Sequence, residues 1–224
     1  YLIFDFFYNR SFTLKNLFTK SRVLYLITDR TTSSLNLTEI TQRAVSAGIK
    51  TIQLREKNMT KKELYKEALS IRKFTLKHRA TFIINDYVDI ALAVNADGVH
   101  LGQEDMPIRE ARKLLGENKI IGISTHSLKQ AVDAQMAGAD YIGFGPIFKT
   151  TTKDAGSPKG IESLIEIKKH IKIPVVAIGG ITIDNVSEVF KSGANAVAVA
   201  SGILSGDIKK NTEGLYQQIK AVRI

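Results

Sequence analysis

Gln53, Arg55 and Lys57 alternate along the segment Gln53-Leu-Arg-Glu-Lys57, at the end of a short apolar run. Alternate residues of an extended strand face the same side. Gln53 and Arg55 are therefore expected to point together, and Lys57 joins them if the extended backbone continues. An amide, a forked guanidinium and an ammonium at one place suit a polyphosphate ligand. The alternative is an ion pair of Arg55 or Lys57 with Glu56.

Two aspartates, Asp86 and Asp105, follow the next two apolar runs. If those runs are neighbouring parallel strands, the carboxylates lie close together at one edge. Such a pair beside a phosphate site suits Mg²⁺, which takes one or two carboxylates together with phosphate oxygens and water. Singly, each aspartate could instead cap the helix that follows it. Their placement opposite Arg55 and Lys57 favours metal binding.

A second set of anion-binding groups comes later in the chain. The long irregular stretch 146–159 carries Thr150, Thr152 and Lys153, whose hydroxyl and ammonium groups suit anionic oxygens. The alternative is a solvated flexible loop. Gly179-Gly180 and Ala200-Ser201 follow the last two apolar runs, where many parallel barrels bind phosphate on backbone N–H groups. This pattern predicts a monophosphate site without identifying the molecule that carries the phosphate.

Ser124 ends the fifth apolar run and has His126 two residues away, with no carboxylate evident to orient that histidine. We therefore expect Ser124 to donate a hydrogen bond to phosphate or pyrophosphate and not to act as a nucleophile. His100 lies within an apolar run and is interpreted as a satisfied interior histidine. The residues as a whole suit the joining of two phosphorylated molecules with loss of pyrophosphate.

Eight apolar runs, separated by segments of helical periodicity, must position these groups. They are residues 23–28, 50–54, 81–84, 98–101, 120–123, 141–144, 175–178 and 196–199. Their lack of strict alternation is typical of parallel strands covered by helices. The pattern predicts an α/β protein, a single-domain (β/α)₈ TIM barrel whose site lies at the carboxyl ends of the strands. Thr60, Ser127 and Thr182 are predicted helix N-caps.

Composition narrows the function classes. The 224 residues include no cysteine, which excludes disulfides, thiolate zinc sites and a cysteine nucleophile. The four histidines are scattered without metal-ligand spacing. The formal net charge is +10, but its lysines are spread along expected helices without interleaved aromatic residues. That distribution argues against nucleic-acid binding. The simplest interpretation of the positive charge is a solvated lysine-rich surface. A second interpretation is a positive electrostatic field that favours phosphorylated substrates.

Residues 1–22 stand apart because they hold five of the ten phenylalanines. Asp5 and Arg10 interrupt their apolar stretch, so a membrane span is not expected. The segment also lacks a basic start and a small-residue cleavage site, so a signal peptide is not expected. We expect an N-terminal arm or helix packed on a barrel formed by residues 23–224, in a cytoplasmic protein. A homodimer is the candidate assembly.

The ordered motifs resemble the thiamin phosphate synthase family over residues 24–219. They are Tyr25-Leu-Ile-Thr-Asp29, Gln53-Leu-Arg-Glu-Lys57, Asn85-Asp86, Gly98-Val-His-Leu-Gly-Gln-Glu-Asp105, Ile123-Ser-Thr-His126, Gly145-Pro-Ile-Phe148 with Thr150-Thr-Thr-Lys153, Ile178-Gly-Gly-Ile181 and Ala200-Ser201. The resemblance implies a transferase that joins hydroxymethyl-pyrimidine diphosphate to thiazole phosphate, releasing pyrophosphate. It also implies a dissociative mechanism assisted by Mg²⁺.

The resemblance further implies a role for each matching residue. Asp86 and Asp105 would hold Mg²⁺. The pyrimidine diphosphate would be contacted by Gln53, Arg55, Lys57, Asn85, Ser124 and Lys153, of which Arg55, Lys57, Ser124 and Lys153 would be catalytic. The thiazole phosphate would be held by Thr150, Thr152, Gly180, Ala200 and Ser201. Two positions depart from the family pattern: Lys149 replaces a frequent proline, and Ala200 replaces a larger aliphatic residue.

Two alternatives stay open. One is the related thiazole tautomerase, which shares the barrel and a histidine near the position of His126 but typically lacks the aspartate pair. The other is a non-catalytic barrel that binds a phosphorylated ligand. The presence of Asp86, Glu104 and Asp105 favours the synthase.

Overall fold

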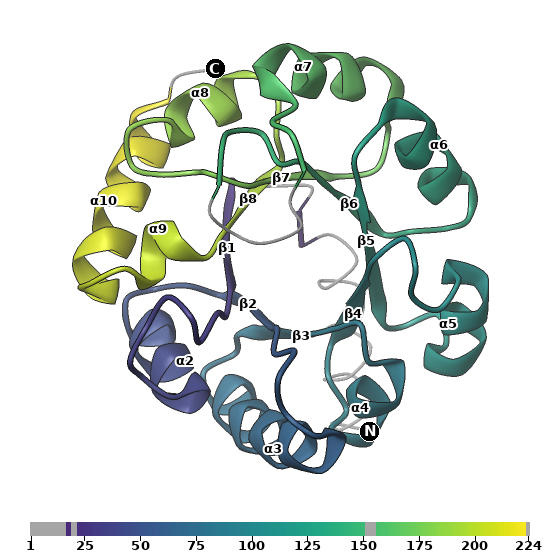
Figure 1. Cartoon of the computed structure of the whole chain (residues 1–224), viewed down its shortest axis with the longest axis vertical. Coiled ribbons are helices and arrows are strands. Elements are labelled where there is room, and N and C mark those ends of the chain that lie inside the picture. Colours follow the sequence, from purple (N-terminus) through teal and green to yellow (C-terminus); the bar gives the residue numbers. More distant parts are fainter. Residues whose placement is uncertain (1–16, 19–21, 151–155, 223–224) are drawn as a thin grey trace, which may run out of the picture.

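The computed structural model describes residues 17–18, 22–150 and 156–222. Eight parallel strands close into a barrel in chain order (Figure 1). They are β1 (Val23–Ile27), β2 (Thr51–Leu54), β3 (Thr81–Asn85), β4 (Gly98–Leu101), β5 (Ile120–Thr125), β6 (Tyr141–Phe144), β7 (Val175–Ile178) and β8 (Ala196–Val199). Pairing of Leu24 with Val197 on β8 closes the ring. The predicted TIM barrel is confirmed.

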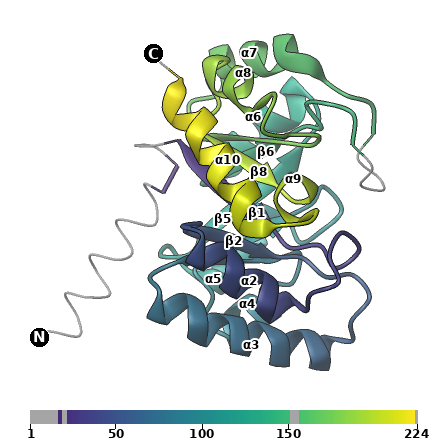
Figure 2. The same ribbon diagram turned by 90° about the vertical axis from the view of Figure 1, so that its left-hand side faces the viewer.

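Helices surround the barrel in both views (Figures 1 and 2). They are α2 (Leu37–Ser46), α3 (Lys61–Lys77), α4 (Val88–Ala93), α5 (Ile108–Leu115), α6 (Leu128–Met136), α7 (Gly160–His170), α8 (Val186–Lys191), α9 (Ser201–Leu204) and α10 (Ile208–Ala221). Within the described part of the chain, α9 is the additional short helix after β8. Its first residue is the predicted site residue Ser201.

Local sequence sets where these helices begin. Thr60 caps α3 through a reciprocal pair of hydrogen bonds with Glu63, and Ser127 caps α6 by accepting from the Gln130 N–H. Both predicted caps are confirmed. The prediction for Thr182 is wrong, because α8 begins at Val186 with Asn185 as its N-cap residue. Asn185 instead turns its side chain back to the Thr182 N–H and the Gly180 carbonyl, which tightens the preceding loop.

Apolar side chains fill two regions, one between the strands and the helices and one inside the barrel. Every residue of β2, β4, β6 and β8 is buried, as expected for strands covered on both faces. A bidentate ion pair between Arg72 of α3 and Asp97 before β4 is buried in the outer region, with N···O distances of 2.8 and 3.0 Å. The Asp97 carboxylate also accepts from the Phe82 N–H, which holds the start of β3 against the start of β4.

Little of the N-terminal segment falls within the described residues. Phe18 is buried inside the barrel, with its ring centroid 4.8 Å from that of Tyr141 and 5.8 Å from that of Tyr25. Residues 1–16 and 19–21 lie outside the described residues, so the arm as a whole stays a prediction. No described helix has both the length and the apolar character needed to cross a bilayer.

Candidate active site

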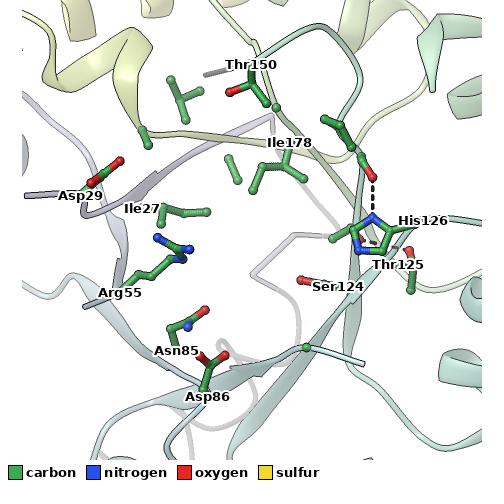
Figure 3. Close-up of a pocket in the computed structure, with 18 of the residues that line it drawn as sticks. Ile27, Asp29, Arg55, Asn85, Asp86, Ser124, Thr125, His126, Thr150 and Ile178 are labelled. Atoms are coloured by element: carbon green, nitrogen blue, oxygen red, sulfur yellow. Dashed lines mark hydrogen bonds between the residues drawn. The ribbon is translucent and has the colours of Figure 1, made fainter. Parts of the chain in front are cut away.

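The carboxyl ends of the strands surround a cavity of about 660 Å³, a size suited to small organic ligands. Ten predicted site residues line it: Arg55, Lys57, Asn85, Asp86, Asp105, Ser124, Thr150, Gly180, Ala200 and Ser201. Figure 3 shows Arg55, Asn85 and Asp86 on one side of the cavity, with Thr150 and Ile178 across from them. Asp29, Gln103 and His126 also border it. The predicted residues Thr152 and Lys153 lie outside the described residues.

Asp86 and Asp105 meet at the ends of β3 and β4, where their carboxyl groups hydrogen-bond to each other. Burial, followed by the hydrogen bond and charge of Asp105, raises the pKa of Asp86 to about 7. The Asp86 backbone has a φ of 63°, a left-handed conformation that aspartate tolerates better than most residues. Its N–H donates to the His100 carbonyl at 2.8 Å, which ties β3 to β4 at this point.

The two aspartates are not helix caps. The N-cap residues of α4 and α5 are Tyr87 and Pro107, and neither helix has a side-chain cap. Asp105 instead accepts from the Gly102 N–H at 2.6 Å within its own loop. The alternative interpretation of both residues as caps is therefore wrong. A pair of carboxyls held together with one raised pKa is a site that a cation would stabilise.

The basic side of the cavity is formed by Arg55 and Lys57. The Thr28 hydroxyl accepts from the Arg55 N–H at 3.0 Å, which fixes the backbone where β2 ends. The positive charges of Lys57 and Arg55 both act to lower the pKa of Asp86, so they face the carboxyl pair. Glu56 pairs instead with Arg30 at 3.9 Å. The alternative, an ion pair of Glu56 with Arg55 or Lys57, is therefore wrong.

Glycines bring the opposite side of the cavity close to the loop after β6. Gly180 has a φ of 66°, and a Cβ there would lie 2.5 Å from the Lys149 carbonyl oxygen. A Cβ on Gly179 would lie 2.4 Å from the Pro146 Cβ. Both positions exclude a side chain because the two loops pack directly on each other. The loop that carries Thr150 is thus positioned by the glycine pair after β7.

Gln53 and His100 lie below the cavity, in the barrel interior. Gln53 is only 1% exposed and donates from Nε2 to the Tyr25 hydroxyl at 2.9 Å. Direct contact of Gln53 with a substrate stays a prediction. His100 is a hydrogen-bonded interior histidine as predicted, with contacts to the Tyr141 and Ser124 hydroxyls. Burial lowers the pKa of His100 to about 4, against the opposing charge of Asp105. Its ring is therefore neutral at pH 7.

His126 is oriented by backbone and not by a carboxylate. Its Nδ1 lies 2.7 Å from the Gly145 carbonyl oxygen, as the dashed line in Figure 3 marks. A carbonyl only accepts, so Nδ1 carries the proton. No described carboxylate is hydrogen-bonded to this ring, and His126 and Ser124 do not form part of a charge-oriented nucleophile system.

A closed parallel barrel with paired carboxylates, basic side chains and a glycine-lined rim at the same end defines an enzyme of the phosphate-handling (β/α)₈ class. The family model for thiamine monophosphate synthase matches residues 24–203. The chain belongs to that family, which confirms the resemblance drawn from its motifs and makes the protein a transferase.

Relatives agree with this assignment over nearly the whole barrel. The chain is 44% identical over 199 residues to the thiamine-phosphate synthase of Clostridium acetobutylicum, covering 88% of this chain and 94% of the relative. It is 45% identical over 213 residues to that of Methanosarcina mazei, covering 94% and 88%. The solved thiamine phosphate pyrophosphorylase of Pyrococcus furiosus superimposes with a TM-score of 0.84 at 43% identity, covering 92% of this chain and 99% of that one.

Proposed function

We propose that this protein joins hydroxymethyl-pyrimidine diphosphate to thiazole phosphate, giving thiamin phosphate and pyrophosphate. The observation that carries the proposal is one cavity lined by two differently built groups of residues, each suited to an anion. The aspartate pair with Arg55 and Lys57 lies at the ends of β2 to β4, and the glycine pair with Ser201 lies at the ends of β7 and β8. Two phosphorylated substrates can thus meet within one enclosure.

The first site suits the diphosphate together with Mg²⁺. Two carboxylates are the number that this cation commonly takes from protein, since phosphate oxygens and water complete its shell. The described residues contain no group of three candidate ligands, so the substrate would have to supply the rest. The raised pKa of Asp86 supports the fit, because a bound cation would relieve the repulsion from Asp105. When bound, Mg²⁺ would stabilise negative charge on the leaving pyrophosphate.

The reaction we propose breaks the bond between the pyrimidine methylene carbon and the diphosphate oxygen, whose electron pair leaves with pyrophosphate. The thiazole nitrogen then forms a bond to the resulting pyrimidine cation. Arg55 and Lys57 would stabilise the growing charge on pyrophosphate, and Asn85 and Ser124 would hold the diphosphate substrate. Lys153 is proposed to act with them on sequence grounds alone. No general base is needed, because the attacking nitrogen carries no proton.

The second site is proposed to hold the thiazole phosphate. Ser201 begins α9, and the first N–H groups of a helix have no partner within the helix, which suits an anion. Gly180, Ala200 and Thr150 lie at the same rim, and Thr152 is proposed to join them. In this proposal the thiazole phosphate is bound mainly by backbone N–H groups. The charged side chains across the cavity then bind the diphosphate.

Incubation of the protein with both substrates and Mg²⁺ tests the proposal. We expect thiamin phosphate to form only when both substrates are present and to stop when a chelator removes the metal. Formation of thiamin phosphate at the uncatalysed rate would contradict the proposal. A variant with Asp105→Ala serves as the inactive control, since it removes half of the proposed metal site.

An isomeric thiazole phosphate, given as the only substrate, tests the tautomerase alternative in the same assay. The synthase proposal expects no isomerisation of that compound in the absence of the pyrimidine diphosphate. Rapid isomerisation by the wild-type protein and its loss in His126→Ala would favour the tautomerase instead.

A further inference from the structure

A continuous chain of hydrogen bonds runs from the barrel interior to the cavity. Gln53 Nε2 donates to the Tyr25 hydroxyl at 2.9 Å, and that hydroxyl lies 3.1 Å from the Tyr141 hydroxyl. Tyr141 reaches His100 Nδ1 at 2.8 Å, and His100 Nε2 reaches Ser124 Oγ at 2.9 Å. Ser124 lines the cavity, whereas Tyr25 and Tyr141 are at most 1% exposed. The chain thus connects a cavity hydroxyl to four groups behind it.

The chain has a direction, because each hydroxyl has a single proton to donate. Tyr25 accepts from the Gln53 amide, and among the described residues the Tyr141 hydroxyl is the one other group hydrogen-bonded to the Tyr25 oxygen. A buried hydroxyl proton needs an acceptor, so the Tyr25 proton goes to Tyr141. Tyr141 then donates to His100 Nδ1, which leaves the proton of the neutral ring on Nε2. Burial raises the pKa of both tyrosines, so both hydroxyls keep their protons. His100 Nε2 therefore donates to Ser124, whose own proton is available to the cavity.

Two glycines make room for the chain within the strands. A Cβ on Gly122 of β5 would lie 2.1 Å from the Tyr141 Cζ and 2.5 Å from its hydroxyl oxygen. A Cβ on Gly143 of β6 would lie 3.1 Å from the His100 Cε1. Glycine weakens a strand interior, and it marks places where another group approaches closely. Both glycines are buried, and both spaces are taken by members of the chain.

We infer that this chain makes Ser124 a hydrogen-bond donor to the diphosphate substrate, with His100 and Tyr141 as positioning residues. The identity of the acceptor rests on the proposed function, whereas the direction of the chain does not. In the opposite direction Ser124 would donate to His100 and present only lone pairs to the cavity. Such an oxygen would repel an anionic phosphate oxygen. The chain therefore decides whether Ser124 attracts or repels the leaving group.

The tautomer of His100 tests the direction in the wild-type protein without any substrate. Long-range proton–nitrogen NMR of the ¹⁵N-labelled protein separates a ring protonated on Nε2 from one protonated on Nδ1. The His100 signal is assigned by its absence in His100→Asn. We expect the proton on Nε2 at pH 7. A proton on Nδ1 would reverse the chain and overturn the inference, whether or not the protein is a synthase.

A double-mutant cycle tests whether the chain acts through Ser124. The probe is inorganic pyrophosphate with Mg²⁺, and its Kd is measured by titration calorimetry for wild type, Tyr141→Phe, Ser124→Ala and the double variant. We expect Tyr141→Phe to weaken binding up to about tenfold, the contribution of one hydrogen bond. In the Ser124→Ala background the same substitution should change the Kd by less than about twofold, since the donor is already gone.

The control distinguishes this coupling from a general loss of packing. Thr41→Val removes a buried hydroxyl of α2 whose one hydrogen bond to a described residue is to the Leu37 carbonyl of the same helix. This substitution should leave the pyrophosphate Kd unchanged. If Tyr141→Phe weakens pyrophosphate binding equally with and without the Ser124 hydroxyl, the role of Tyr141 is merely structural. That result would overturn the inference. If pyrophosphate fails to bind the wild-type protein, the proposed function fails, and the NMR measurement still decides the direction of the chain.

Discussion

At the scale of single residues, ionisation of the aspartate pair lowers the stability of the metal-free protein. Burial and the neighbouring Asp105 raise the pKa of Asp86 to about 7, from an ordinary value of 3.8. An acid whose pKa is higher in the folded state than in the unfolded state destabilises the fold when it ionises. The penalty is absent near pH 4, grows as the pH rises, and is complete above pH 7.

Asp86→Asn should therefore raise the Tm of the metal-free protein at pH 8, and the gain should shrink as the pH falls toward 4. Asparagine also tolerates the left-handed backbone at this position. Asp89→Asn is the matched control, because the Lys61 hydrogen bond lowers the pKa of Asp89 and its removal brings no gain. Thermal unfolding across pH measures both variants. A lower Tm for Asp86→Asn at pH 8 would show that the pair carries no such cost.

Addition of Mg²⁺ gives a second prediction for the same residue. The wild-type Tm should rise with Mg²⁺, because a ligand that binds only the folded state stabilises it. Asp86→Asn should lose most of this rise, since half of the proposed ligand set is neutral. An equal rise in both proteins would place the bound metal elsewhere.

At the scale of elements, the loop after β6 is held by the glycine pair after β7. Gly180→Ala should displace Phe148 and Lys149, and with them Thr150, because the new Cβ would lie within 3.0 Å of both residues. We expect weaker binding of thiazole phosphate and little change for pyrimidine diphosphate, which is proposed to bind at β2 to β5. Titration calorimetry with each ligand separately measures this.

Gly206→Ala is the matched control for that variant. Gly206 also has a left-handed backbone, with a φ of 81°, but no atom of the described residues lies within 4 Å of a Cβ there. It carries the same kind of backbone strain without the displaced loop, so both ligands should bind normally. If Gly180→Ala weakens both ligands equally while remaining folded, the division of the cavity into two sites is wrong.

The helix caps give a prediction about stability. Thr60→Ala should lower the free energy of unfolding by about 1 kcal/mol, the usual contribution of an N-cap. Thr182→Ala should have almost no effect, because the Thr182 side chain caps no helix and Thr182 bonds to Asn185 through its backbone N–H and carbonyl, which alanine keeps. Urea unfolding of both variants measures the difference. Equal losses would mean that the capping geometry does not explain the stability of α3.

These caps also mark how far local sequence predicts an element. The cap at Thr60 was predictable because Glu63 completes a reciprocal hydrogen-bond pair within four residues. Thr182 has the right side chain, but Asn185 competes for the same turn and bonds back to Gly180. The packing of the loop around Gly180 decides whether Thr182 or Asn185 precedes α8. A local sequence pattern does not contain that information.

At the scale of the whole molecule, the barrel could be predicted because eight short, mostly apolar runs alternate with segments of helical periodicity. Chain order then placed Asp86 beside Asp105, since consecutive strands of such a barrel are neighbours. The chain through Tyr25, Tyr141 and His100 could not be found this way. Its members come from β1, β6 and β4, which are not consecutive, and they meet only across the barrel interior. Polar residues within apolar runs, such as His100, indicated that these groups have buried partners but not which partners.

Phosphorus NMR of a reaction mixture tests the central claim most directly, because it follows both products at once. With both substrates, Mg²⁺ and wild-type protein, the account predicts that thiamin phosphate and pyrophosphate appear together in equal amounts. Omission of the thiazole phosphate should prevent thiamin phosphate formation, and a chelator should suppress both signals. Release of inorganic phosphate in place of pyrophosphate, or no thiamin phosphate from folded protein with both substrates and Mg²⁺, would contradict the account.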